Sequence, residues 1–174
     1  MVLAGPATHQ LLTQGGATTI GSVPGATEAG DRFGSALGAA DFDDNDADNL
    51  VVGVPGENLG AVADAGAVIS LCGSDGQFEG CGDGVLTQGN PEAGDAYGAA
   101  LTPGNFAGNE FPDLAVGAPG ERVAGKATAG ATDARDGGAS GLPADPDEPL
   151  YFQGNAGVPG TAEAGDQFVA ALSA

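Results

Sequence analysis

The chain has 174 residues, with 24 acidic side chains against four basic ones, and its formal net charge at pH 7 is -20. This charge excludes nucleic acid as a natural partner because phosphate contacts need a basic patch, and it disfavours anionic membrane surfaces for the same reason. No run approaches the ~20 apolar residues that a spanning helix needs, so we expect no membrane insertion.

A tandem repeat organises the sequence. Residues 30–34 return as residues 94–98 and residues 52–57 return as residues 116–121, both with an offset of 64, and a third start lies at residues 165–168. One shared offset indicates a structural unit copied in tandem, whose apolar face is buried by its neighbours. The 33 glycines and 11 prolines are also compatible with disorder, but their fixed places in the period favour a folded repeat.

The first complete unit is predicted to span residues 30–93. Residues 1–29 precede it as the end of an earlier unit, with short strands at residues 2–4 and 11–14. Within the unit we expect four strands, at residues 33–40, 50–54, 67–71 and 85–88, and loops at residues 41–49 and 72–84. Apolar runs of strand length that end in Gly and Pro turns support this reading, and no window shows sustained helical periodicity.

The second unit is predicted to span residues 94–164, with strands near residues 97–102, 113–117, 127–134 and 150–153. A stretch rich in Gly, Pro and Asp near residues 135–149 predicts a mobile loop, and residues 165–174 would form the first strand of a next unit. Four short strands per unit describe a propeller blade. We therefore expect an all-β fold, a partial and open β-propeller of four-stranded antiparallel blades, two complete and flanked by partial ones.

The motifs resemble the FG-GAP repeat, which builds the β-propeller of integrin alpha subunits and occurs in many secreted bacterial proteins. Phe33-Gly34 with Gly53-Val54-Pro55, and Tyr97-Gly98 with Gly117-Ala118-Pro119, fit that pattern around an intervening loop. The resemblance implies a calcium-binding extracellular adhesion or ligand-binding module rather than an enzyme. It implies a protein or glycan ligand on the loop face, and further blades from the same or another chain. The alternatives are a non-catalytic accessory domain of a secreted hydrolase, or a truncated fragment without independent activity.

The acidic loop at residues 41–49 is the strongest candidate site. Oxygen ligands at positions 1, 3, 5, 7 and 9 of a tightly coiled loop converge on one point, and calcium prefers such ligands. These positions hold Asp41, Asp43, Asn45, the carbonyl of Ala47, and Asn49. The resembling family prefers Asp at position 9 and Gly at position 6, where this chain has Asn49 and Asp46. The alternative is a solvated acidic turn that binds no ion.

The second copy of this loop is a weaker calcium candidate, with Asn105, Asn109 and Asp113 as ligands. Ala107 stands at position 3 and offers no side-chain oxygen. Asn side chains readily bond to nearby backbone groups in turns. We therefore expect this loop to be held by its own side chains rather than by an ion.

Cys72 and Cys81 are the two cysteines, nine residues apart. A disulfide between them would contribute roughly 2–3 kcal/mol and would indicate a secreted or cell-surface location. A zinc site is disfavoured because the chain has one histidine and no Cys-x2-Cys spacing. A phosphate-binding loop ending at Lys126 is disfavoured as well, since Ala127 stands where Ser or Thr would hold magnesium.

Overall fold

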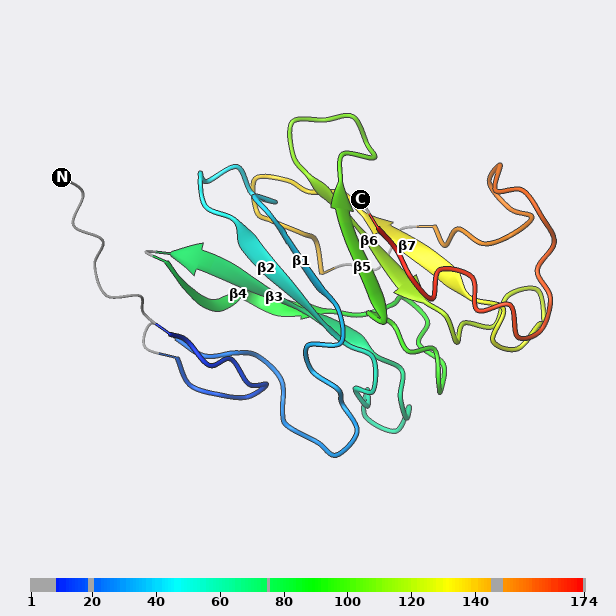
Figure 1. Cartoon of the computed structure of the whole chain (residues 1–174), viewed down its shortest axis with the longest axis horizontal. Coiled ribbons are helices and arrows are strands. Elements are labelled where there is room, and N and C mark those ends of the chain that lie inside the picture. Colours follow the sequence, from blue (N-terminus) through cyan, green and yellow to red (C-terminus); the bar gives the residue numbers. More distant parts are fainter. Residues whose placement is uncertain (1–8, 19–20, 75, 145–148, 174) are drawn as a thin grey trace.

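The computed structural model describes residues 9–18, 21–74, 76–144 and 149–173, and all regular structure within them is β. The first sheet holds β1 (Leu37–Ala40), β2 (Asn49–Val54), β3 (Ala67–Ser74) and β4 (Gln77–Leu86), and the second holds β5 (Ala100–Gly104), β6 (Asp113–Ala118) and β7 (Ala131–Arg135). Both sheets are open and antiparallel, and their strands follow one another in chain order (Figure 1). The predicted all-β class is confirmed. None of the described segments forms a helix that could cross a bilayer.

The register of the two sheets repeats with the sequence. Val52 of β2 pairs with Ile69 of β3, and Val116 of β6 pairs with Asp133 of β7. Both members of the second pair lie 64 residues after their counterparts in the first. The two sheets are therefore copies of one structural unit, as the shared offset predicts.

The main core lies between the two sheets, where β1 and β2 contact β5. Its buried members come from both units and are Phe42, Val51, Val68, Leu86, Tyr97, Leu101, Leu114, Val116 and Ala118. The opposite face of the first sheet carries a second cluster, made of Val23, Val52, Val54, Ile69 and Leu71. Because side chains alternate along a strand, neighbouring residues such as Val51 and Val52 serve different clusters. The first sheet is thus covered on both faces.

The start of each unit docks onto the unit before it through backbone hydrogen bonds. The N–H groups of Gly94, Ala96 and Tyr97 donate to the carbonyls of Ala63, Asp64 and Ala65. The N–H groups of Gly165, Gln167 and Phe168 donate to Ala127, Thr128 and Ala129 in the same order. We call these two sets of bonds the unit junctions, and they show that the third sequence start adopts the geometry of the second.

Glycines at equivalent positions of the two units allow the next unit to pack closely against the sheet. A Cβ on Gly53 would collide with the carbonyl oxygen of Gly98, and a Cβ on Gly117 would collide with that of Val169. Each of these glycines lies within a strand that is paired on both sides, β2 or β6, where a side chain would normally favour β structure. Their small size instead lets the backbone of the following unit approach the sheet.

The loop predicted over residues 72–84 is wrong. β3 continues to Ser74 and β4 begins at Gln77, so most of this stretch is a paired hairpin. Two glycines of this hairpin lie where another segment approaches closely. A Cβ on Gly73 would meet the carbonyl oxygen of Asp48, and a Cβ on Gly80 would lie 2.9 Å from the ring of Pro24.

The second unit does not form the complete four-stranded blade that we predicted. Its fourth strand is reduced to one bridge between Thr132 and Tyr151. Pro149 lacks the N–H that would extend the ladder at one end. After the bridge, Asn155 accepts a hydrogen bond from the N–H of Phe152 and donates one to the carbonyl of Leu150. These two bonds hold residues 150–155 in a turn.

The flanking strands are not present either within the described part of the chain. Residues 11–14 and 167–172 are irregular, and the N-terminal segment forms one bridge, between Ala17 and Ser22. The strand predicted at residues 2–4 lies outside the described residues. An isolated strand needs neighbours to complete its backbone hydrogen bonds, and no strand of the described residues lies on the outer side of these segments.

Candidate metal centre

The acidic loop connects β1 to β2, and Asn49 is the first residue of β2. Asp41 follows β1 directly and organises the turn through its carboxylate. Its Oδ1 accepts a hydrogen bond from the N–H of Asn45 at 3.0 Å, and its Oδ2 accepts one from Asp46 at 2.9 Å. Asn45 in turn accepts the N–H of Ala47 at 2.9 Å. The loop therefore coils tightly around its own side chains, as the predicted calcium loop requires.

Two residues of this loop take up the left-handed conformation. The φ angle is 54° at Asp44 and 67° at Asp46. Asp46 stands where the resembling family has glycine, and aspartate tolerates this conformation better than most residues. The departure at position 6 is thus compatible with the coiled loop.

Asp41 and Asp43 lie together at the centre of the loop. Burial, and then the hydrogen bond and the charge of Asp41, raise the pKa of Asp43. Burial also acts to raise the pKa of Asp41, but hydrogen bonds from the backbone of Asn45 and Asp46 outweigh it and lower that pKa. Asp43 Oδ1 is buried and has no hydrogen-bond partner. Two neighbouring carboxylates with one unsatisfied oxygen form a setting that a cation would stabilise.

Asn49, the ninth residue of the loop, faces the protein interior. It is buried, and its Oδ1 accepts the N–H of Phe42 at 3.0 Å. Its Nδ2 points to the disulfide, 3.9 Å from Cys81 Sγ. Among the five predicted ligands, the structure therefore brings Asp41, Asp43, Asn45 and the backbone at Ala47 into one turn, and it uses the side-chain oxygen of Asn49 to close the loop.

The second loop closes in the way that we expected, through its own side chains. Asn105 accepts the N–H of Gly108 at 2.7 Å and donates to the carbonyl of Asn109 at 2.6 Å, while Asn109 accepts the N–H of Phe111. Asp113 is fully buried. Its Oδ2 accepts the N–H groups of Phe106 and Ala107, and its Oδ1 accepts that of Gly137. Three backbone N–H groups thus bind the carboxylate that we considered as a ligand, and its full burial keeps it inside the loop.

The donor set of the first loop suits a hard cation. Among the described residues, no three or more His, Cys, Asp or Glu side chains are grouped so that they could hold a metal ion. A site here would combine the two carboxylates with Asn45 and backbone carbonyls, which are the oxygen ligands that calcium accepts. Each carboxylate oxygen has more than one lone pair, so the bonds to the loop backbone leave acceptor capacity at Asp41.

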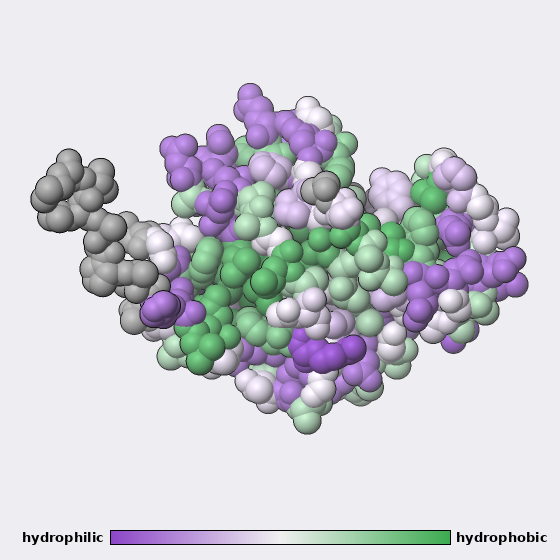
Figure 2. Space-filling view, viewed as in Figure 1, coloured by the Kyte–Doolittle hydropathy of each residue, from purple (hydrophilic) through white to green (hydrophobic). Residues whose placement is uncertain are grey.

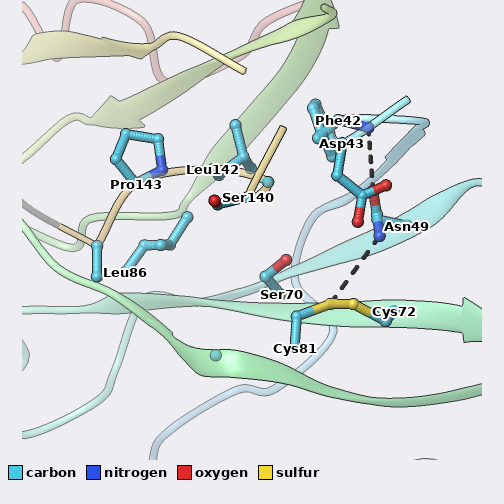
Figure 3. Close-up of a pocket in the computed structure, with 13 residues that line it drawn as sticks. Phe42, Asp43, Asn49, Ser70, Cys72, Cys81, Leu86, Ser140, Leu142 and Pro143 are labelled. Carbon is cyan, nitrogen blue, oxygen red and sulfur yellow. Dashed lines mark hydrogen bonds between the residues drawn. A yellow bond between two sulfur atoms is a disulfide. The ribbon is translucent and has the colours of Figure 1, made fainter. Parts of the chain in front are cut away.

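The predicted disulfide joins Cys72 of β3 to Cys81 of β4, with a Cα–Cα distance of 5.1 Å. It forms one wall of a pocket that also reaches the acidic loop (Figure 3). Figure 3 shows Asp43 and Asn49 at one end of this pocket and Leu86 and Pro143 at the other. The pocket was not foreseen from the sequence because residues 140–144, which form its second wall, come from the stretch that we predicted to be mobile.

A buried polar trio at the second sheet was also missed. Tyr97 donates its hydroxyl to Asp133 Oδ2 at 2.8 Å, and Arg135 Nε donates to the same oxygen at 2.7 Å. Arg135 further donates to the carbonyls of Thr87, Pro143 and Ala144, and its guanidinium carbon lies 5.9 Å from the ring centroid of Tyr97. Burial, and then the charge of Asp133, raise the pKa of Tyr97, which keeps its hydroxyl protonated.

The repeat itself contains the signal that could have revealed this trio. At the equivalent positions, 64 residues earlier, the first unit has Phe33, Ile69 and Leu71. Those three side chains belong to the apolar cluster on the outer face of the first sheet. A polar residue at a repeat position that is apolar in the other copy indicates a buried hydrogen-bonded group.

A second pattern recurs between each unit and the segment before it. Gln14 donates to Glu57, and Gln88 donates to Glu121. Burial is the main cause that raises the pKa of Glu121 to about 7. Because the equivalent pair occurs in both units, we read these contacts as structural.

Comparison with known proteins gives no match, either to a protein-family model or to a curated protein. Membership of the FG-GAP family therefore stays a prediction from the motifs.

Proposed function

We propose that this chain is part of a calcium-stabilised β-propeller of the FG-GAP type and acts as a non-enzymatic binding module of a secreted or cell-surface protein. The observation that carries this proposal is the repeated unit junction. The second and third starts dock by equivalent hydrogen bonds, and such a regular step between successive sheets is what a propeller requires.

The proposed partners are further blades, which would pack against the outer side of the second sheet. At the positions equivalent to Val51 and Val68, 64 residues later, the second sheet has Ala115 and Thr132, and both are half-buried on its outer side. Phe168 and Val169 are half-buried there at the start of the next unit. A following blade, from this or another chain, would bury these residues as the second sheet buries Val51 and Val68 of the first.

The acidic loop is proposed to bind calcium through Asp41, Asp43, Asn45 and the carbonyl of Ala47. A bound ion supplies the positive charge that balances the paired carboxylates of the turn. Asp41 orients the loop through its backbone bonds, and Asn49 anchors the end of the loop to Phe42. The second loop keeps the same turn without an ion because Asp113 bonds the backbone instead.

The ligand-binding surface is proposed to lie on the loops at this end of the sheets. The loops after β1 and β5 are equivalent, so they lie at the same end of their two units. They expose Asp44, Asp46 and Phe106, a mixture of charge and aromatic surface that suits a protein or glycan partner. The disulfide fits an oxidising compartment, which agrees with a secreted or surface location.

Thermal unfolding with calcium, with magnesium and with chelator tests the metal site. Saturating calcium at 100 times the dissociation constant should stabilise the chain by about 2.7 kcal/mol, and magnesium at equal ionic strength should not. Asp41→Asn should remove the calcium effect. Asp48→Asn is the matched control because it makes the same charge change at an exposed position of the same loop. Equal stabilisation by both ions, or an equal response of both variants to calcium, would refute the site.

A further inference from the structure

A pocket of about 410 Å³ lies beside the disulfide, between the β3–β4 hairpin and residues 140–144. This volume falls in the range of small-molecule sites, which is roughly 300–1,000 Å³. The pocket is open to solvent on one side, and it is lined by residues from both units (Figure 3). It is large enough for a small metabolite and too small for a folded partner.

One end of the pocket is polar. Asp43, Asn49 and Ser70 lie there, and Figure 3 shows the Asp43 carboxylate beside the Asn49 amide. Asp43 is the one ionisable side chain among the lining residues that the structure describes, since both cysteines are in the disulfide. Its Oδ1 is buried without a hydrogen-bond partner. An unpaired buried acceptor is unfavourable, so a bound donor at this position would be stabilised.

The other end of the pocket is apolar. Leu86 and Pro143 lie there, with Leu142 between the two ends, and the disulfide extends this surface along one side (Figure 3). The distal wall is held by the buried trio, because Arg135 donates to the carbonyls of Pro143 and Ala144. The N–H of Gly138 also donates to the carbonyl of Phe42. The wall is therefore positioned before any ligand enters, which reduces the entropy lost on binding.

We propose that this pocket binds a small organic ammonium ion, with the protonated amine at Asp43 and an apolar chain running towards Leu86 and Pro143. The negative charge of the Asp43 carboxylate favours a cationic ligand. A carboxylate or phosphate would be placed against Asp43 in a chain of net charge -20, and a neutral alcohol would lack the charge-assisted hydrogen bond. The pocket and the proposed calcium site share the Asp43 carboxylate, so a calcium ion would compete with the ammonium ligand. The experiment is therefore done in chelator, where binding of the ammonium ion does not require that the loop binds calcium.

Calorimetric titration with a series of n-alkyl ligands tests the proposal. Butylammonium, pentylammonium and hexylammonium are titrated into the full chain in chelator at low salt. Hexanol and hexanoate serve as the neutral and anionic analogues. We expect one site per chain, with an affinity for the ammonium ions that rises roughly fourfold with each added methylene. Hexanoate should not bind, and hexanol should bind at least tenfold more weakly than hexylammonium.

Two substitutions locate the site. Asp43→Asn keeps the shape of the side chain and should abolish the preference for hexylammonium over hexanol. Asp44→Asn is its matched control, because Asp44 is exposed and does not line the pocket. Leu142→Ala should flatten the chain-length dependence while leaving the preference for ammonium intact. Equal binding of hexylammonium and hexanoate, no saturable binding, or equal effects of Asp43→Asn and Asp44→Asn would each overturn the proposal.

Discussion

Replacing Asp133 by alanine should destabilise the protein far more than the same change at the surface. Asp133 accepts hydrogen bonds from Tyr97 and from Arg135, and the exposed fraction of Arg135 is 0%. The variant removes the Asp133 carboxylate from its ion pair with the buried guanidinium, and breaking a buried pair in this way costs about 3–5 kcal/mol. Domains of this size have a stability of about 5–15 kcal/mol, so a large share would be lost.

The other copy of the repeat supplies a compensating variant. The triple change Tyr97→Phe, Asp133→Ile and Arg135→Leu installs the residues that the first unit has at its equivalent positions. Buried ion pairs replaced by apolar side chains of similar volume are often neutral or more stable by about 1–4 kcal/mol. The carbonyls that Arg135 releases belong to Thr87, Pro143 and Ala144, none of which is a fully buried residue, so water can replace the guanidinium. We therefore expect the triple variant to recover most of the stability that Asp133→Ala loses.

Urea unfolding followed by circular dichroism measures both effects. With a denaturant dependence of about 2 kcal/mol per molar urea, Asp133→Ala should lower the midpoint by roughly 2 M. Asp136→Ala is the control, since it removes an exposed carboxylate three residues after Asp133. If Asp133→Ala and Asp136→Ala shift the midpoint equally, the buried pair does not contribute as we argue. A triple variant as unstable as Asp133→Ala would refute the equivalence of the two units.

Two further predictions concern pH and the hairpin glycines. Burial raises the pKa of Glu121 from its ordinary value of 4.5 to about 7, so the folded state binds a proton more tightly than the unfolded state. This difference contributes about 3 kcal/mol to the free energy of unfolding. The contribution is fully present below pH 4.5 and is lost as the pH rises through 7. The urea midpoint should therefore fall between pH 4.5 and 7.5, and Glu121→Gln should reduce this fall. The exposed control Glu110→Gln should leave the fall unchanged. Identical pH profiles for the two variants would contradict the role given to Glu121. Gly73→Ala should cost about 1–3 kcal/mol because its Cβ would collide with the carbonyl of Asp48, while Gly138→Ala, whose Cβ meets open space, should change the midpoint by less than half as much. Equal costs at the two glycines would show that the hairpin tolerates a side chain there.

The sequence predicted the all-β class, the repeated unit and the disulfide, because these follow from local patterns. Apolar runs between Gly and Pro turns place β2 and β6 within one or two residues of their observed bounds. Two cysteines in one unit leave a single pairing, and the hairpin brings them together.

The errors arise where a residue serves a contact far away in the chain. Gly73 and Gly80 lie in the stretch predicted as a loop, but each accommodates a segment that the local sequence does not identify. The missing fourth strand of the second unit depends on the competing hydrogen bonds of Asn155. The pocket depends on Arg135, whose partners lie up to 48 residues away. Neither propensity nor periodicity carries information about such distant partners.

The unit junctions have a consequence for how such a chain could lengthen. The six hydrogen bonds that define the two unit junctions join backbone groups, and the close approaches involve glycines that each copy brings with it. Duplication of one whole unit would therefore create a new joint without any compensating substitution. Removal of half a unit would leave the backbone groups of one junction without hydrogen-bond partners. Growth by entire units is the evolutionary step that this geometry permits most easily.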